Sequence, residues 1–344
     1  MCSDYFPSDQ ESPRRKSQGG PLRPPPGFGS RGLSRRQSPV TWEAGRDLEP
    51  EGVPAGRPPV GRPAAGGGAA ERLAGRFGRA VWRLAGTSQQ VHEVTELVAR
   101  VQAAVTTGRR IAVIGVRPGV GTSTVTALTA MALAHYRRDR VMAVDADPAP
   151  GVLPERLAVA GDAPSLADLG RTGSRLAGFE EIRDLLGRTR GGLWVLGGYG
   201  ARELPAASYQ TGMSLLGRFF AVTVTDCGTG PGDEITRTVL GTSHAQILVT
   251  DATTDGAAYA RKVLEQAYQG GGRTLVAFVA AKPGRLDLAQ AARRLPGEVG
   301  AVLVGHDRHL AQSTPIAARE LTETVSTSVT ELAAAALGRA LGAA

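Results

Sequence analysis

A short apolar stretch, a glycine-rich loop and a helical pattern follow one another near the middle of this chain and restrict its fold most strongly. Residues 111–114 are apolar and rich in β-branched side chains, and the run stops at Gly115. The loop that follows contains Gly119 and Gly121, and alanine and leucine then recur at helical spacing as far as His135. A strand, a glycine loop and a helix in this order surround a phosphate with backbone N–H groups at the helix N-terminus. The sequence therefore predicts a phosphate-binding loop, but one without the lysine that such loops usually carry.

Beyond this loop the chain alternates between strand-like and helical stretches. Apolar runs predict strands at 141–144, 193–196, 221–225, 245–250, 274–280 and 301–304. Helical patterns occur at 88–106 and near 180–186, 209–218, 254–268, 287–295 and 317–341. This alternation predicts an α/β fold with a doubly wound, mostly parallel sheet that is covered by helices on both faces.

Composition divides the chain into three parts. Residues 1–68 are rich in proline, glycine and arginine, and 12 of the 22 prolines lie before residue 64. Such a stretch buries too little apolar surface to offset its ordering entropy, so we expect a disordered tail that could dock on a protein partner. Residues 69–86 form a basic segment, and residues 87–344 are expected to form the folded domain.

The basic segment at 69–86 has the pattern of an amphipathic helix. Its apolar stripe consists of Leu73, Phe77, Val81 and Leu84, and four arginines lie beside it. Such a helix can pack on the main domain, dock on a partner or lie on an anionic membrane, and the sequence does not choose among these. Two glycines in the segment weaken its helical propensity.

Charge and cysteine content limit the classes of protein to which the chain can belong. Residues 1–85 hold 14 of the 40 basic and 8 of the 32 acidic residues, so they carry most of the net charge of +8. The remainder is nearly neutral, which does not favour sequence-specific nucleic-acid binding; contact through the basic part would be non-specific and salt-dependent. Two cysteines, Cys2 and Cys227, exclude a disulfide framework and fit a reducing cytoplasm. With no apolar run of membrane-spanning length and no signal peptide, we expect a cytoplasmic protein, or one peripheral at the membrane.

Acidic residues follow two of the predicted strands. Asp145 and Asp147 come directly after the strand at 141–144, and Asp226 follows the strand at 221–225. In a parallel sheet these strand ends meet at the edge where ligands bind. A glycine loop, a hydroxyl from Ser123 and carboxylates at this edge are the components of a phosphate and Mg²⁺ site.

These stretches resemble the MinD/ParA-like ATPases, whose deviant phosphate loop reads lysine-glycine-glycine-valine-glycine-lysine-threonine-threonine. Residues 117–124 read Arg-Pro-Gly-Val-Gly-Thr-Ser-Thr at the matching place. The stretches at 139–148, 225–230 and 306–310, with the proline-rich tail, look like the branch found beside type VII secretion systems of actinobacteria. The resemblance covers about residues 70–340. It implies ATP and Mg²⁺ as ligands, a nucleotide-dependent homodimer, and a role in type VII secretion or in a membrane or cell-pole complex.

The resemblance also assigns roles to individual residues. Arg117 matches the signature lysine that reaches a dimer partner's nucleotide, and Asp147 matches the switch carboxylate that positions the attacking water. Both are thus the candidate catalytic residues. The candidate nucleotide-binding residues are Arg117, Gly119, Val120, Gly121, Thr122, Ser123 and Thr124. The candidate Mg²⁺ ligands are Ser123, Asp145 and Asp226.

Departures from the family's pattern weaken the expected activity. Thr122 stands in place of the phosphate-loop lysine, Val116 in place of the first glycine, and Pro118 removes a backbone donor. Residues 280–282 read Ala-Ala-Lys where the family usually has an adenine-reading asparagine. A hydrogen bond to a charged group is worth about 1.5–3 kcal/mol, so we expect weak nucleotide binding and little or no ATP hydrolysis.

Two alternatives remain open at this point. The chain could be an active, ATP-dependent dimerising switch, since Ser123, Asp147 and Asp226 are all retained. It could also be an NAD-binding Rossmann protein, because residues 119–124 approach the pattern G-x-G-x-x-G and Asp145 follows at about the right distance. Against the second alternative, Thr124 occupies the position of the third glycine.

Overall fold

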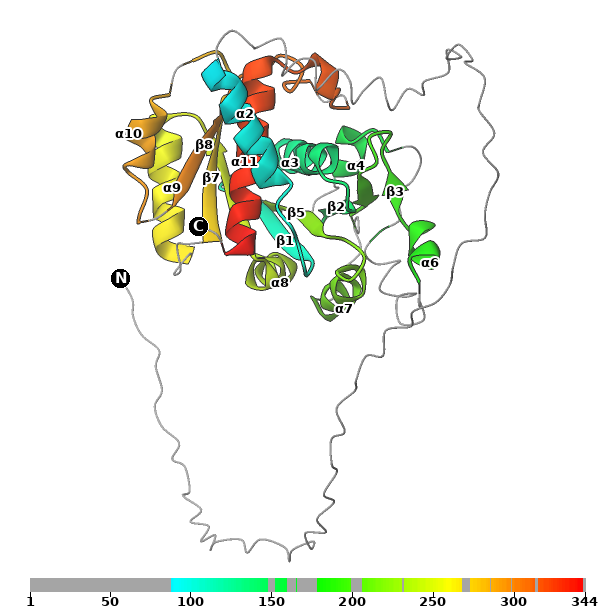
Figure 1. Cartoon of the computed structure of the whole chain (residues 1–344). Coiled ribbons are helices and arrows are strands. Elements are labelled where there is room, and N and C mark those ends of the chain that lie inside the picture. Colours follow the sequence, from blue (N-terminus) through cyan, green and yellow to red (C-terminus); the bar gives the residue numbers. More distant parts are fainter. Residues whose placement is uncertain are drawn as a thin grey trace, which may run out of the picture. The chain divides into compact units, whose positions relative to one another are not determined.

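The computed structural model describes residues 88–147, 152–159, 165, 178–198, 206–230, 232–267, 273–284, 286–297, 299–312 and 315–342. The chain divides into two units, Met1–Pro63 and Ala64–Ala344, and every described residue belongs to the second (Figure 1). The predicted tail at 1–68 and the basic segment at 69–86 therefore lie outside the described residues.

The second unit is built on an eight-stranded sheet with the spatial order β3-β4-β2-β5-β1-β6-β7-β8. In chain order the strands are β1 Arg109–Gly115, β2 Val141–Asp145, β3 Gly187–Arg188, β4 Trp194–Leu196, β5 Val222–Thr229, β6 Ala245–Asp251, β7 Thr274–Val279 and β8 Gly300–Val304. Only the edge pair β3–β4 is antiparallel, and the other neighbouring strands run parallel. The predicted mostly parallel α/β sheet is confirmed.

The central strand of this sheet is β1. Ile111 pairs with Val224 of β5 on one side and with Ala245 of β6 on the other. From Ile111 to Ile114 the side chains of β1 are at most 1% exposed. An apolar run without alternation is typical of a parallel strand that is covered on both faces, and this is the environment that β1 occupies. The glycine loop thus begins at the middle of the sheet.

Helices cover both faces of the sheet. They are α2 Ser88–Val101, α3 Thr122–Tyr136, α4 Leu153–Arg156, α6 Phe179–Arg183, α7 Ala206–Leu216, α8 Glu234–Thr242, α9 Thr254–Ala267, α10 Leu288–Ala292, the 3₁₀ turn η3 Ala318–Glu320, and α11 Glu323–Leu341. Figure 1 shows α11 on one side of β1, with α2 lying against it, and α8 on the other side of β1. Both α3 and α11 pack directly on the sheet.

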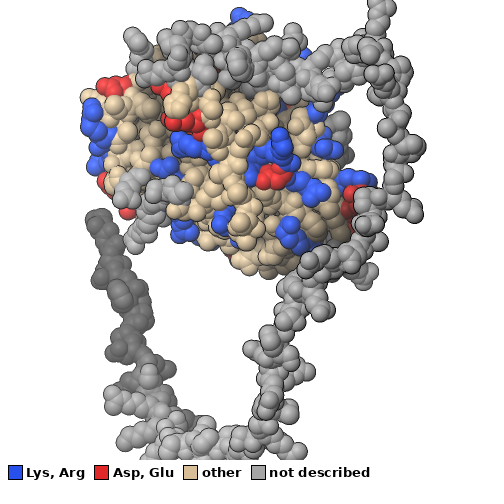
Figure 2. Space-filling model, viewed as in Figure 1, with Lys and Arg blue, Asp and Glu red and all other residues tan. Residues whose placement is uncertain are grey.

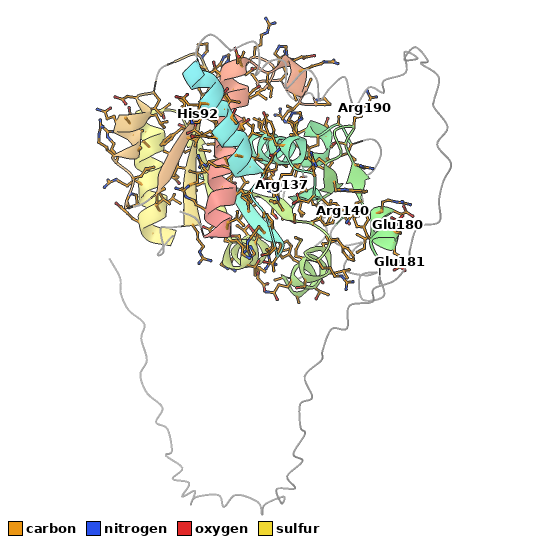
Figure 3. The ribbon with its side chains drawn as sticks, viewed as in Figure 1. His92, Arg137, Arg140, Glu180, Glu181 and Arg190 are labelled. Atoms are coloured by element: carbon orange, nitrogen blue, oxygen red, sulfur yellow. The ribbon has the colours of Figure 1, made fainter. Side chains whose placement is uncertain are left out.

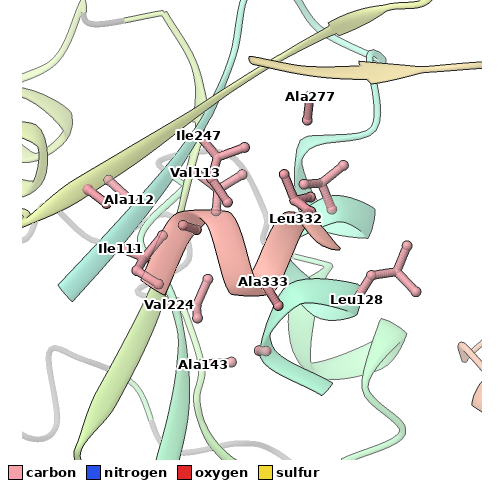
Figure 4. Close-up of a cluster of buried hydrophobic side chains, with 14 of the residues drawn as sticks. Ile111, Ala112, Val113, Leu128, Ala143, Val224, Ile247, Ala277, Leu332 and Ala333 are labelled. Atoms are coloured by element: carbon pink, nitrogen blue, oxygen red, sulfur yellow. The ribbon is translucent and has the colours of Figure 1, made fainter. Parts of the chain in front are cut away.

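The main core lies between α3, α11 and the central strands (Figure 4). Leu332 and Ala333 of α11 are fully buried there, and Leu128 of α3 is 2% exposed. α3 is buried around most of its circumference, because the sheet covers one side and α11 the other. This enclosure explains why its sequence is rich in alanine, leucine and threonine and contains no Asp, Glu, Lys or Arg.

Several boundaries differ from the prediction. The first helix ends at Val101 and not at 106, and the expected helix at 317–341 is divided into η3 and α11 by extended backbone at Leu321 and Thr322. β5 continues to Thr229, so Asp226 lies inside the strand and not in the loop after it. The short elements α4 and β3 and the threonine-rich helix α8 were not predicted. α8 begins at an Asp233 cap, whose carboxylate accepts from the Thr236 N–H at 2.7 Å.

Among the described residues, no helix combines the length and the apolar character needed to cross a bilayer.

Candidate functional site

The predicted phosphate loop joins β1 to α3 and depends on two glycines in left-handed conformations. Gly119 has φ +81° and Gly121 has φ +96°, a region that L side chains rarely adopt. Gly121 is also the residue before the first turn of α3, and its carbonyl accepts the Val125 N–H at 2.9 Å. The backbone of the loop therefore turns sharply and continues directly into the first turn of a 15-residue helix. This is the geometry of an anion cradle.

Thr122 lies at the position where such a loop carries its lysine. Its side chain is packed against the end of β1, since a Cβ on Gly115 would collide with Thr122 Oγ1. Thr122 is only 7% exposed. The side chain at this position thus fills the inner side of the loop and supplies no positive charge.

Two carboxylates lie side by side below the loop. Asp145 ends β2 and Asp226 lies on β5, and the two residues are partners in the parallel register. Both are almost completely buried, at 0% and 1% exposed. Asp145 accepts the N–H groups of Asp147 at 3.2 Å and Leu153 at 3.3 Å. The parallel pairing of β2 with β5 thus brings together two acids that are far apart in the sequence.

Asp226 has two further neighbours within the site. It accepts the Gly228 N–H at 3.1 Å and also hydrogen-bonds the hydroxyl of Ser123, from the first turn of α3. Ser123 is thus already joined to a carboxylate of the predicted metal site. The phosphate loop and the strand-end acids therefore form one continuous site.

Burial and mutual repulsion perturb these two acids. Burial, and to a smaller degree the charge of Asp145, raises the pKa of Asp226 to about 7. Burial also raises the pKa of Asp145 to about 6, and the two N–H groups that it accepts oppose this shift. Two adjacent buried carboxylates favour proton or cation binding, because either one relieves both desolvation and repulsion.

Asp147 is placed by a close approach to Gly228. A Cβ added to Gly228 would lie 2.5 Å from the Asp147 Cγ, and Gly228 has φ +64°. Only glycine fits here on both counts. Gly228 therefore leaves room near the end of β5 for the side chain of Asp147, which comes from the loop after β2.

Arg117, the charged residue of the loop, forms an ion pair within the chain. Its Nη2 and Nε lie 2.7 and 3.0 Å from Oδ1 of Asp251, at the end of β6. Thr253 donates to the other oxygen of Asp251 at 2.9 Å. Partial burial tends to raise the pKa of Asp251, but the hydrogen bonds from Arg117 and Thr253 outweigh it and lower the pKa. The Arg117 side chain is 61% exposed, so it lies at the mouth of the site and not inside the loop.

Neither lysine of the described region replaces the missing loop lysine. Lys262 lies on α9 and Lys282 follows β7, and both are exposed. Among the described residues, no hydrogen bond or ion pair joins either lysine to the loop. Lys282 follows the end of β7, whose Val279 lies 3.6 Å from the position of a Cβ on Gly121. Residues 280–282 stand where the family usually has an adenine-reading asparagine. They directly follow β7, which ends beside the phosphate loop.

Comparison with solved structures identifies this arrangement. A ParA family ATPase from Chlorobium tepidum gives a TM-score of 0.55 at 16% identity, over 65% of this chain and 98% of that one. MinD in the MinC:MinD complex of Aquifex aeolicus gives 0.52 at 16% identity, over 67% and 96%. MinD of Pyrococcus horikoshii with Mg-ADP gives 0.50 at 17% identity, over 66% and 94%. The chain has the MinD/ParA fold.

A curated relative of this chain is a secretion-associated protein. The ESX-1 secretion-associated protein EspI of Mycobacterium tuberculosis is 32% identical to it over 250 residues. The match covers 66% of this chain but only 36% of EspI, so the chain spans about a third of the length of the relative. No protein-family model matches the chain. The resemblance to MinD/ParA proteins, with a secretion-associated relative, is confirmed.

The MinD/ParA-like site offers oxygen ligands of the kind that Mg²⁺ prefers. Ser123, Asp145 and Asp226 supply a hydroxyl and two carboxylates. Ser123 is hydrogen-bonded to Asp226, and Asp145 is the partner of Asp226 across the parallel strands. In the part of the chain that the structure describes, no three His, Cys, Asp or Glu side chains form a metal cage. Mg²⁺ usually binds through one or two carboxylates with waters and phosphate oxygens, so this donor set fits it.

The structure brings together most of the residues singled out from the sequence, but one important residue was missed. Asp251 was overlooked, although it directly follows the apolar run at 245–250 as Asp145 follows its own strand.

His306 precedes a polar turn in which the Asp307 carboxylate accepts the N–H groups of His309 at 2.8 Å and Thr322 at 2.9 Å. Asp307 therefore stabilises the connection from β8 to α11.

Proposed function

We propose that this chain is an accessory or regulatory protein of a type VII secretion system that binds a magnesium nucleotide weakly and hydrolyses ATP slowly or not at all. The similarity to a secretion-associated protein supports the cellular role. The retained loop, Ser123 and the paired carboxylates support the ligand class. The proposal departs from an ordinary ATPase at Thr122 and Arg117.

Thr122 is the single observation that carries the proposal. Phosphoryl transfer depends chiefly on positioning and on positive charge near the transferred group. An uncharged side chain packed against Gly115 supplies neither. Ground-state binding is affected less, because the helix N-terminus and the loop amides still favour an anion.

Arg117 does not compensate in this conformation. Its guanidinium is bonded to Asp251, and it would have to exchange this partner for a phosphate oxygen. An exposed ion pair of this kind is worth about 0.2–1 kcal/mol, so the exchange is affordable but unfavourable. Arg117 is thus a candidate for a contact made only when nucleotide, or a second subunit, is present.

The carboxylates would act together with a bound cation. Ser123, Asp145 and Asp226 would hold Mg²⁺, which neutralises charge on the phosphate oxygens when bound. Asp147, beside Gly228, would orient a water molecule at the same edge of the sheet. These residues keep the site able to bind even where the loop charge is missing.

Calorimetry of the full-length chain with ATP, in the presence and absence of Mg²⁺, tests the proposal. We expect weak, magnesium-dependent heat, and tighter binding in Thr122→Lys, with Thr122→Met as the uncharged control of similar length. Losing a charged hydrogen bond costs about 1.5–3 kcal/mol, so the gain should be about tenfold or more. Ordinary ATP turnover by the wild type that is lost in Asp147→Ala would refute the proposal.

The active dimerising switch remains the second candidate, favoured by the convergence of Ser123, Asp145 and Asp226. It predicts that ATP and Mg²⁺ shift the protein from monomer to dimer, as measured by light scattering. Arg117→Ala should remove this shift. The NAD-binding alternative is disfavoured by topology, because β1 lies between β5 and β6, whereas the Rossmann order places the second strand beside the first.

The proline-rich tail and the basic segment complete the proposal. Residues 1–68 would dock on a protein of the secretion machinery, and residues 69–86 would contact a partner or an anionic membrane. Removal of residues 1–68 should then abolish capture of that machinery but leave the calorimetric signal unchanged. Removal of residues 69–86 should weaken sedimentation with vesicles of phosphatidylserine.

A further inference from the structure

A cavity lies at the end of the parallel strands opposite to the phosphate loop. Its volume is about 420 Å³, and its walls include residues 137–140, just before β2 begins at Val141. The nucleotide site lies at the other end of β2, where Asp145 ends the strand. Five residues of strand separate the two by roughly 15 Å. The cavity is therefore separate from the predicted nucleotide site.

Arginine and aromatic side chains dominate this cavity. Those used below are Arg138, Arg140, Arg183, Arg188, Phe179 and Trp194. Figure 3 labels Arg137 and Arg140 on this side of the molecule, together with Glu180 of α6. Figure 2 shows basic side chains gathered on the same part of the surface, with a few acidic ones among them.

The aromatic rings hold two of these arginines in place. The Cζ of Arg140 lies 3.8 Å from the ring centre of Phe179, and that of Arg188 lies 4.8 Å from the ring of Trp194. The two rings contact each other edge to face, with centroids 5.2 Å apart. A guanidinium stacked on a ring face keeps its N–H groups in its own plane, where they can still donate to an anion. The two stacks thus present preorganised donors beside one cavity.

Carboxylates neutralise only part of this charge. Arg137 is bound to Asp139 by two hydrogen bonds of 2.8 and 2.5 Å, and Arg183 pairs with Glu180 and Asp184.

The remaining three arginines have a different environment. No ion pair formed between described residues involves Arg138, Arg140 or Arg188. The cavity therefore carries an excess of positive charge that its own described side chains do not balance.

We propose that this cavity binds a phosphate group, either as free phosphate or as the phosphomonoester of a lipid. Arginine binds phosphate through paired N–H donors, and stacking reduces the entropy lost on binding. The 420 Å³ volume accommodates a small anion. Arg140 and Arg188 are the principal donors, and Arg138 contributes from the exposed rim.

Calorimetry with inorganic phosphate on the full-length chain tests this site, with chloride adjusted to keep ionic strength constant. We expect saturable binding that weakens about tenfold in Arg140→Gln and in Arg188→Gln, because each loses a charged hydrogen-bond donor. Arg138→Gln should weaken it less. Arg138 stacks on no described ring, so this variant preserves the test if a stacked arginine is needed for folding. Arg261→Gln, on α9 and paired with Glu265, is the matched control and should leave binding unchanged.

Two further arms locate the phosphate and its source. Ser123→Ala should retain the phosphate signal, whereas its loss would place the anion in the nucleotide loop and overturn the proposal. Sedimentation with phosphatidylcholine vesicles, with and without phosphatidic acid, tests for a lipid source. The readout is the difference in sedimentation between the wild type and Arg140→Gln, because the basic N-terminal region also attracts anionic vesicles. Equal phosphate affinity in the wild type, Arg140→Gln, Arg188→Gln and Arg138→Gln would refute the site.

Discussion

The ion pair between Arg117 and Asp251 controls the free charge at the phosphate loop. The Asp251→Asn variant keeps an acceptor for Thr253 but loses the charge that holds Arg117. We expect the affinity for ATP and Mg²⁺ to rise by up to about fivefold, the value of an exposed ion pair. Titration calorimetry measures this gain.

Asp255→Asn is the matched control for this change. Asp255 is exposed in the first turn of α9, four residues further along the chain. Its substitution alters the net charge equally but leaves the Arg117 contact intact, so the affinity should not rise. If Asp251→Asn also leaves the affinity unchanged, Arg117 plays no part in binding the nucleotide.

His244 is expected to give the fold a specific sensitivity to acid. Its Nδ1 accepts the Arg110 N–H at 3.0 Å, and burial, followed by the charges of Arg109, Arg110 and Arg273, lowers its pKa below 6.5. A histidine with a lowered pKa in the folded state takes up its proton more readily when unfolded. Its contribution to stability is therefore complete above pH 6.5 and is lost as the pH falls through 6.5 toward the folded-state pKa.

The change in Tm between pH 7.5 and pH 5.5 measures this effect. His244→Asn retains an acceptor for the Arg110 N–H but does not titrate, so its Tm should fall less than that of the wild type. The buried pair Asp145 and Asp226 titrates in both proteins and cancels in the difference. An equal fall in Tm for both proteins would contradict the role of His244.

At the scale of elements, the end of β5 determines where Asp147 can lie. Gly228→Ala introduces a Cβ that would lie 2.5 Å from the Asp147 Cγ and also strains a backbone with φ +64°. We expect a loss of about 1 kcal/mol from the backbone and, in addition, displacement of Asp147. Thermal unfolding measures the first effect, and the magnesium-dependent heat of nucleotide binding measures the second.

Gly230→Ala separates these two effects. Gly230 has φ +71° on the same segment, but a Cβ there meets nothing within 4 Å. It should lose similar stability while retaining the magnesium-dependent heat. If both variants retain that heat, the placement of Asp147 against Gly228 does not matter for ligand binding.

The strands were predictable where the sequence contains a long apolar run. The runs at 141–144, 245–250 and 274–280 became β2, β6 and β7 with boundaries one residue different at most. α8 was missed because its nine residues include three threonines and one glycine, which have weak helical propensity. Its stability comes from the Asp233 cap and from packing against β1 and β5, which no local pattern reveals.

At the scale of the whole molecule, α11 closes one face of the sheet. Leu332 is fully buried between α11 and the central strands (Figure 4). Leu332→Ala should destabilise the domain by about 2–5 kcal/mol, because it removes apolar contacts and leaves a cavity. Leu341→Ala, at the half-buried end of the same helix, should cost less in urea or thermal unfolding. Equal losses in both variants would show that α11 does not seal the core at its centre.

The order of the strands determined which predicted site residues meet. Asp145 and Asp226 are 81 positions apart in the chain yet are paired neighbours, because β5 lies between β1 and β2. Asp251 reaches Arg117 because β6 flanks β1 on the other side. Sequence alone predicted the acids at strand ends, but it could not predict strand order, since parallel strands can be connected in many orders across one sheet.

The sequence by itself determined the local chemistry of this protein: a strand–glycine loop–helix, the uncharged Thr122, and carboxylates at the ends of apolar runs. These properties depend on neighbouring residues and on periodicity, which a linear sequence contains. Only the tertiary structure decided that Arg117 is held by Asp251, that Asp147 lies against Gly228, and that stacked arginines line a cavity at the other end of the strands. Those contacts depend on strand order and on side-chain packing between distant segments, and both are settled only when the whole core forms.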